Sequence, residues 1–189
     1  MSHIKKKLPK VTVVMVSYNS EKYITSAIES IKKQIFKNWK LIIVNDCSTD
    51  GTKKILKKCK SKKIKTINLK KNIGAYKATD LAFKKARSKY IAILDSDDYS
   101  HKKRILTQVL ELEKNSEVGL VATRYVLVND KNKILRNSEF VNEKDFVKRF
   151  PCENLCCNSS AMFRADFLKK LKFYDKSIDY SYDYYFYLF

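Results

Sequence analysis

Glycine is scarce in this chain, and the phosphate-binding loops that depend on glycine are missing. The 189 residues include three glycines and two prolines. Neither a G-x-G-x-x-G nor a G-x-x-x-x-G-K-[ST] pattern occurs, so the sequence signals neither a dinucleotide-binding fold nor a P-loop. If phosphate groups are bound, we expect a metal ion to bind their oxygens in place of the backbone N–H groups of a glycine-rich loop.

Long apolar runs and a secretory signal segment are also missing. No run approaches the roughly 18 residues that a membrane-spanning helix requires, so any membrane contact is expected to be peripheral. The five cysteines are an odd number, and no signal-type apolar region precedes them. These features disfavour a secreted, disulfide-held protein. We therefore expect a cytoplasmic location, which includes the inner face of the plasma membrane.

Acidic residues are outnumbered two to one. Forty Lys and Arg side chains face twenty Asp and Glu, which leaves a net charge of +20. Such a charge attracts nucleic acid, an anionic membrane surface or a phosphorylated substrate. The excess is mostly scattered lysine, which is more typical of a solvated surface, and no nucleic-acid-binding motif occurs. We expect no nucleic-acid partner, but peripheral contact with an anionic membrane fits this charge.

Composition and periodicity predict one α/β domain over residues 1–189. Its 44% hydrophobic content is ordinary for a globular protein of this length. Up to residue 100, short apolar runs alternate with helical patterns, which is typical of parallel βα units. Strands are expected at 11–16, 41–44, 64–67 and 90–94, and helices at about 21–33, around 55–56 and over 75–86. One helix stripe should comprise Ile24, Ala27, Ile28, Ile31 and Ile35.

The second half, from about residue 101, has a different pattern. A helix is expected at about 102–114, strands at 119–128 and 133–141, an extended segment at 158–163 and a helix at about 164–171. Asn142 is a plausible N-cap of a short helix. The last eleven residues are mostly aromatic, so we expect them to pack as a helix against the sheet or to mark a chain that has lost further residues.

Polar clusters follow three of the predicted strands, at residues 17–19, 45–48 and 95–98. In an open α/β sheet, ligands bind outside the carboxyl ends of the strands, so these clusters should meet in one crevice. The third contains Asp95, Asp97 and Asp98 directly after an apolar strand. Several carboxylates at the end of a buried strand cost folding free energy unless a positive charge lies beside them. Carboxylate oxygens are hard ligands, which suit Mg²⁺ or Mn²⁺ carrying a diphosphate. The alternative for an isolated motif of this kind is a solvated acidic turn.

Segments 11–19, 39–52, 72–74 and 94–98 together resemble a family 2 glycosyltransferase, of the type that builds bacterial polysaccharides and lipooligosaccharides. The resemblance covers nearly the whole chain and implies the GT-A fold, a Rossmann-like, mixed and mainly parallel sheet flanked by helices. Residues 10–100 would form the nucleotide-binding half and 101–189 the acceptor half. The implied reaction moves a sugar from a nucleotide-diphosphate donor to an acceptor hydroxyl, with inversion at the anomeric carbon.

The resemblance places the base-binding residues at the ends of the first two strands. Ser17, Tyr18 and Asn19 would line the base pocket, and Asp46 would accept the imide N–H of a uracil-like base. A carboxylate facing that N–H forms a charge-assisted bond and disfavours cytosine, which lacks the proton. Glu21 would order this pocket rather than touch the donor, although the helix dipole alone explains an acid in a first turn equally well.

The segment 95–98 resembles the family's DxD motif, whose acids bind the ribose hydroxyls and the cation that bridges the two phosphates. Asp97 is the metal ligand we expect first, and Asp98 takes that role if the turn is offset by one residue. Asp95 and Ser96 would contact the sugar or the nucleotide. Mn²⁺ or Mg²⁺ bound there would neutralise charge on the departing diphosphate.

An inverting transfer also needs a base that accepts the proton of the acceptor hydroxyl. In the family, this base is an Asp in an ED-like motif before an aromatic helix, and Asp183 occupies that place here. Tyr182 replaces the usual acid before it, and Asp179 is the reserve candidate. The alternative for Asp183 is an acid that the dipole favours at a helix N-terminus.

Two departures from the family pattern keep other functions open. Thr79 and Asp80 stand where relatives usually carry Arg-Asn, so the cationic contact to the donor is either missing or supplied by Lys77. The chain also stops soon after Asp183, whereas relatives often continue. One alternative is a catalytically silent or truncated GT-A domain that binds a nucleotide sugar or a partner. Another is a nucleotidyltransferase, which shares the strand-end acids and metal but commonly uses a phosphate loop that is missing here.

The implied substrates are a nucleotide sugar, most simply a UDP-sugar, and a glycan or lipid-linked acceptor. Hexosyl or N-acetylhexosaminyl transfer in surface polysaccharide synthesis, at the cytoplasmic membrane face, fits these features. No Q-x-x-R-W pattern of processive synthases occurs, which favours addition of single sugars.

Overall fold

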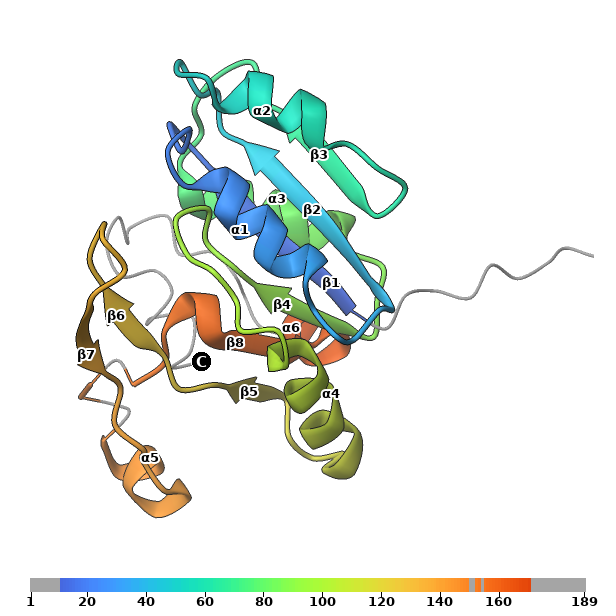
Figure 1. Cartoon of the computed structure of the whole chain (residues 1–189). Coiled ribbons are helices and arrows are strands. Elements are labelled where there is room, and N and C mark those ends of the chain that lie inside the picture. The colour runs from blue at the N-terminus through green and yellow to red at the C-terminus, as the bar shows by residue number, and fades with distance from the viewer. Residues whose placement is uncertain (1–10, 150–151, 154, 171–189) are drawn as a thin grey trace, which may run out of the picture.

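The computed structural model describes residues 11–149, 152, 153 and 155–170, and Figure 1 shows how their elements are arranged. A mixed six-stranded sheet has the order β3-β2-β1-β4-β8-β5. Its first four strands are mutually parallel, whereas β8 runs antiparallel to both β4 and β5. The strands are β1 (Val11–Ser17), β2 (Trp39–Asn45), β3 (Ile64–Asn68), β4 (Tyr90–Ile93), β5 (Leu120–Ala122) and β8 (Ala161–Arg164).

Helices cover both faces of this sheet, as the periodicity predicts. These helices are α1 (Ile24–Lys32), α2 (Thr52–Cys59), α3 (Ala75–Lys85), α4 (Arg104–Lys114) and α6 (Ala165–Lys170), whereas α5 (Glu143–Arg149) lies away from the sheet (Figure 1). Val13 and Met15 of β1 pack with α1, α2 and α4, whereas Val14 points to the other face and packs with α3 and α6. Burial on both faces explains why these strands read as continuous apolar runs.

Helix α1 confirms most of the predicted apolar stripe. Ile24, Ala27, Ile28 and Ile31 are all buried. Burial of an aliphatic side chain of this size contributes about 1.5–3 kcal/mol, so the stripe anchors α1 on the sheet. The prediction was wrong for Ile35, which is 42% exposed, because it lies beyond the end of the helix.

The strand predicted at 119–128 is two strands that belong to different sheets. Segment β5 pairs with β8 in the main sheet, whereas β6 (Val126–Val128) pairs with β7 (Ile134–Asn137) in a separate two-stranded sheet. The chain leaves the main sheet between them, where Arg124 donates to the carbonyl of Ser138 and the Tyr125 N–H donates to the Ser138 hydroxyl. These non-local bonds start the hairpin, and nothing in the local pattern marks the break.

Two further predictions about the second half are settled by hydrogen bonds. Asn142 caps α5, since its side-chain oxygen accepts the N–H of Asp145 at 3.0 Å. The segment predicted as extended from residue 158 instead begins with a 3₁₀ turn, Asn158–Ser160, before β8.

Within the part of the chain that the structure describes, no helix is both long and apolar enough to cross a membrane. The aromatic segment 179–189 lies outside the described residues.

Candidate functional site

A cleft of about 400 Å³ opens where β1, β2 and β4 end. The strands are parallel and Ser17 is in register with Asn45, so the loops that follow them leave the same edge of the sheet. The predicted Tyr18, Asp46, Asp95, Ser96 and Asp97 all line this cleft. Its other lining residues are Val16, Asn72, Gly74, Ala75 and Thr79. The crevice predicted from the strand ends is therefore present.

Asp46 joins the end of β2 to the start of α3. Its carboxylate is buried and accepts the N–H groups of Ile73 at 2.8 Å and Gly74 at 2.9 Å. The Asn72 side chain donates to the Asp46 carbonyl at 3.3 Å. A carboxylate offers about four acceptor sites, so Asp46 can hold this loop and still accept a further donor in the cleft.

Asn19 and Glu21 connect two loops and do not line the cleft. The Asn19 side-chain oxygen accepts the N–H of Thr49 at 2.9 Å, and its own N–H donates to the Ser48 hydroxyl. The Glu21 carboxylate accepts the N–H of Gly51 at 2.8 Å. Both side chains thus tie the loop after β1 to the loop after β2, an ordering role of the kind expected for Glu21.

Ser17 and Tyr18 occupy different environments at the end of β1. Ser17 is buried, and its hydroxyl has no hydrogen-bond partner among the described residues. Tyr18 is 51% exposed and lines the cleft. Two residues further along the loop, the hydroxyl of Ser20 lies 2.7 Å from that of Ser96, which connects this loop to the acidic segment.

Asp95 is held by a segment far away in the sequence. Its carboxylate accepts the Asn158 side-chain N–H at 3.1 Å and the Ser159 hydroxyl at 3.1 Å, and its own N–H donates to that hydroxyl at 2.9 Å. Burial, reinforced by the charge of Asp98, raises the pKa of Asp95 to about 6. The sequence pattern does not indicate Asn158 and Ser159 as site residues, because only the antiparallel pairing of β8 with β4 brings them to this site.

Asp97 and Asp98 are adjacent carboxylates on the exposed turn. Partial desolvation raises the pKa of Asp98, and the charge of Asp97 raises it further, whereas Arg104 acts in the opposite direction. A divalent cation would relieve this excess of negative charge, and carboxylate oxygens suit Mg²⁺ and Mn²⁺. Among the described residues, no three His, Cys, Asp or Glu side chains form a metal-binding group. Phosphate and water oxygens would therefore have to complete the coordination shell.

Arg104 lies behind the acidic segment and is almost completely buried. Its Nη2 donates to the carbonyls of Ile93 at 2.8 Å and Ala161 at 3.1 Å, while Nε donates to Gln108. Arg104 thereby connects α4 to the end of β4 and to the start of β8. The acidic segment follows β4, and the residues that donate hydrogen bonds to Asp95 precede β8.

The remaining predicted residues lie away from the cleft or outside the described part of the chain. Lys77 is exposed on α3 and does not line the cleft, whereas Thr79, on the same helix, does. Asp80 pairs with Lys84 at 2.6 Å. Asp183 and its reserve, Asp179, both lie outside the described residues.

Residues 12–172 match the model of the family described as glycosyl transferase family 2. The chain belongs to this family. An uncharacterized glycosyltransferase of Methanocaldococcus jannaschii is 37% identical over 188 residues, which are 95% of this chain and 64% of that protein. The poly(ribitol-phosphate) beta-N-acetylglucosaminyltransferase TarS of Staphylococcus aureus is 35% identical over 122 residues, 62% of this chain and 21% of TarS.

Two solved structures show that this family 2 chain has the GT-A fold. A crystal structure of S. aureus TarS in complex with UDP matches with a TM-score of 0.77 at 24% identity, over 94% of this chain and 53% of that one. The mannosyltransferase PcManGT of Pyrobaculum calidifontis, in complex with GDP-Man and Mn²⁺, matches with a TM-score of 0.66 at 18% identity, over 88% and 48%. The chain spans less than two thirds of the length of the first curated relatives that it matches.

Proposed function

We propose that this chain is the catalytic part of a metal-dependent, inverting glycosyltransferase that uses a UDP-sugar. The observation that carries the proposal is the cleft at the carboxyl ends of β1, β2 and β4, which has Tyr18 and Asp46 on its wall together with Asp95, Ser96 and Asp97. Family membership supports the reaction class. The TarS complex with UDP supports a uridine donor.

In this proposal the cleft binds the donor from base to sugar. Tyr18 packs against the uracil base. Asp46 accepts the imide N–H of that base, because its carboxylate has acceptor sites beyond the one that the Gly74 N–H occupies. Asp95 and Ser96 contact the ribose or the sugar. Asp95 is preset for this contact because Asn158 and Ser159 fix its carboxylate.

Asp97, which lines the cleft, is the residue that would hold Mn²⁺ or Mg²⁺, and Asp98 takes that role if the turn is offset by one residue. A cation bound there would supply Lewis-acid stabilisation of the leaving diphosphate. The Mn²⁺ in the PcManGT complex supports this part of the proposal. Asp183 stays our candidate for the base that accepts the proton of the acceptor hydroxyl, with Asp179 in reserve.

The acceptor is a hydroxyl of a glycan or of a lipid-linked glycan in the synthesis of a surface polysaccharide. TarS, named for transfer of N-acetylglucosamine to poly(ribitol-phosphate), supports both this setting and an N-acetylhexosaminyl donor. A cytoplasmic enzyme in peripheral contact with an anionic membrane fits the net charge of +20.

The experiment that tests the proposal is a calorimetric titration of the protein with UDP, GDP and CMP, each with Mn²⁺ and with a chelator. Selective, metal-dependent binding of UDP is the expected result. A screen of UDP-sugars for hydrolysis or transfer should then follow. Preference for GDP would replace the uridine assignment, and UDP binding without turnover would favour a catalytically silent GT-A domain. Absence of nucleotide binding under every condition would overturn the proposal.

A further inference from the structure

A second hollow, of about 320 Å³, lies at the opposite end of the sheet from the cleft. Its walls come from the amino ends of strands: Thr12 is the second residue of β1, Lys40 is the second residue of β2, and Ser88 lies just before β4. Thr12 and Tyr18 are separated by about 20 Å of extended strand, given a rise of about 3.3 Å per residue. This hollow, here called the basic pocket, is therefore distinct from the donor cleft.

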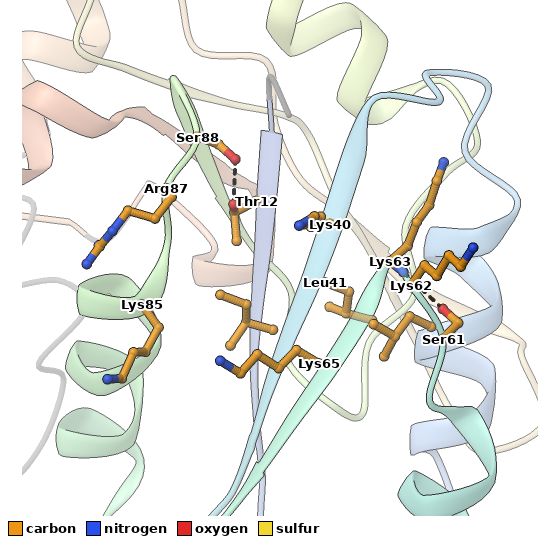
Figure 2. A pocket seen from close by; sticks show the side chains of 12 residues that line it. Thr12, Lys40, Leu41, Ser61, Lys62, Lys63, Lys65, Lys85, Arg87 and Ser88 are labelled. Carbon is orange, nitrogen blue, oxygen red and sulfur yellow. Dashed lines mark hydrogen bonds between the residues drawn. The ribbon is translucent and has the colours of Figure 1, made fainter. Parts of the chain in front are cut away.

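The lining of the basic pocket contains six cationic side chains and no acidic one. These are Lys40, Lys62, Lys63, Lys65, Lys85 and Arg87. Figure 2 shows Lys85 and Arg87 on one side, Lys62 and Lys63 on the other, and Lys40 and Lys65 between them. The charges come from β2, from β3 and the loop before it, and from the end of α3 and the loop after it, so the fold gathers cations that are scattered in the sequence.

None of the six forms an ion pair with an acid in the part of the chain that the structure describes. Lys63 and Arg87 do make hydrogen bonds, but to backbone carbonyls, those of Lys37, Lys84 and Ala86. A guanidinium has five N–H donors, so Arg87 retains some for a ligand. Lys63 also lies over the Trp39 ring, at 4.9 Å from its centroid, but no acidic side chain among the described residues neutralises the charge of these six cations.

The floor of the pocket adds hydroxyl groups to this charge. Thr12 and Ser88 are buried there, with their hydroxyl oxygens 2.6 Å apart (Figure 2). A concave site lined by one sign of charge concentrates the electrostatic field, unlike the same charges on a convex surface. Several cations with nearby hydroxyls match a multiply charged anion that presents many oxygens, which is the chemistry of phosphate groups.

We propose that the basic pocket binds a ligand that carries a diphosphate or several phosphate groups, at a site separate from the donor cleft. The volume of about 320 Å³ is in the range of small-ligand sites and exceeds what a single phosphate requires. The phosphate groups belong either to a soluble compound or to the headgroups of an anionic lipid surface. Both sources present the same chemistry to the pocket, and separate arms of the test distinguish them.

The test compares binding of inorganic diphosphate by the wild-type chain and by the pocket variant K40Q/K65Q/K85Q. Calorimetry with a chelator present removes metal-dependent binding in the donor cleft. Removal of three of the six cations should weaken diphosphate binding by about tenfold or more. The reason is that the attraction between one cation and the anion at close range is comparable with the free energy of a tenfold change in Kd. All three lysines are exposed, so the fold should be retained.

A matched control removes the same charge elsewhere. The variant K53Q/K54Q/K57Q changes three exposed lysines of α2, none of which lines the pocket. It should bind diphosphate as the wild type does. Equal weakening in both variants would show a general effect of net charge and would overturn the proposal, as would absence of diphosphate and vesicle binding by the wild type.

Two further arms identify the source of the phosphate groups. Cosedimentation with phosphatidylglycerol vesicles, but not phosphatidylcholine vesicles, that is lost in the pocket variant would support the site and assign it to lipid headgroups. Pocket-dependent binding of a single-stranded RNA without binding of diphosphate or vesicles would overturn the proposal in favour of nucleic acid. UDP binding should be the same in both variants, so failure here and failure of the proposed transferase function are distinguishable.

Discussion

Asp95 is partly buried just after β4, and its ionised form is disfavoured there. Burial and the charge of Asp98 raise its pKa from 3.8 to about 6, although Ser159 and Asn158 donate hydrogen bonds to it. Between these two pH values the folded protein holds a proton that the unfolded chain releases. Stability should therefore fall as the pH rises through this interval. A carboxylate that is costly to the metal-free fold is typical of a site built for a ligand.

The variant Asp95→Asn should be more stable than the wild type at pH 7 in the presence of a chelator. The gain should be about 1–3 kcal/mol, because the amide cannot ionise. It should disappear near pH 4, where Asp95 is protonated in the wild type. Urea unfolding at both pH values measures this difference. Asp50, whose pKa is lowered by hydrogen bonds despite partial burial, is the control, and Asp50→Asn should destabilise at pH 7.

Asp97 gives the sharpest test of the metal assignment. Asp97→Asn keeps the size of the side chain but removes one of two adjacent carboxylates, so Mn²⁺-dependent UDP binding should weaken at least about tenfold. Isothermal titration with and without Mn²⁺ measures the loss. Glu117→Gln, which removes a charge from the exposed loop after α4, should leave binding unchanged. Unaltered Mn²⁺ dependence in Asp97→Asn would remove this residue from the site.

At the scale of elements, the loop between β3 and α3 depends on the backbone of Gly74. This residue has φ 86° and ψ 150°, a conformation that is essentially restricted to glycine. The N–H groups of Ile73 and Gly74 reach the Asp46 carboxylate because the chain turns there. The backbone conformation of Gly74 thus positions one wall of the cleft. It also positions the Asp46 carboxylate, which we propose accepts the imide N–H of the donor's uracil ring.

Gly74→Ala should destabilise the protein by about 1–3 kcal/mol through backbone strain alone. No atom lies within 4 Å of the Cβ that alanine would add, so steric contact does not contribute. UDP binding should weaken as well, because the two N–H groups move away from Asp46. Thermal unfolding and UDP titration measure the two effects. Lys71→Ala, an exposed change in the same loop, should alter neither, and wild-type behaviour of Gly74→Ala would contradict the role given to this turn.

At the scale of the whole molecule, the net charge of +20 should make stability depend on salt. Most lysines are exposed and repel one another, and the folded state brings them closer than the unfolded chain does. A rise in NaCl from about 0.01 M to about 0.15 M shortens the Debye length from about 30 Å to about 8 Å, so Tm should rise by a few degrees. Circular dichroism at the two concentrations checks this, and a Tm that falls or stays constant would contradict the argument.

Much of the first half was predictable from the sequence, because its signals are local. Apolar runs and helical spacing predict the alternation of strands and helices, and parallel strands bring their carboxyl ends to one edge. Tyr18, Asp46 and Asp97 could therefore be assigned to one cleft without coordinates. The resemblance to family 2 rested on the same segments, and the family match confirms it.

Features that depend on pairing between distant segments were decided only by the tertiary structure. The partners of Asp95 lie more than sixty residues away and arrive through the antiparallel pairing of β8 with β4. The break between β5 and β6 likewise follows from their different pairing partners. The basic pocket forms because parallel strands also align their amino ends, where lysines from separate elements meet. Periodicity along the chain reports which face of an element is buried, whereas its neighbours are selected by packing across the whole fold.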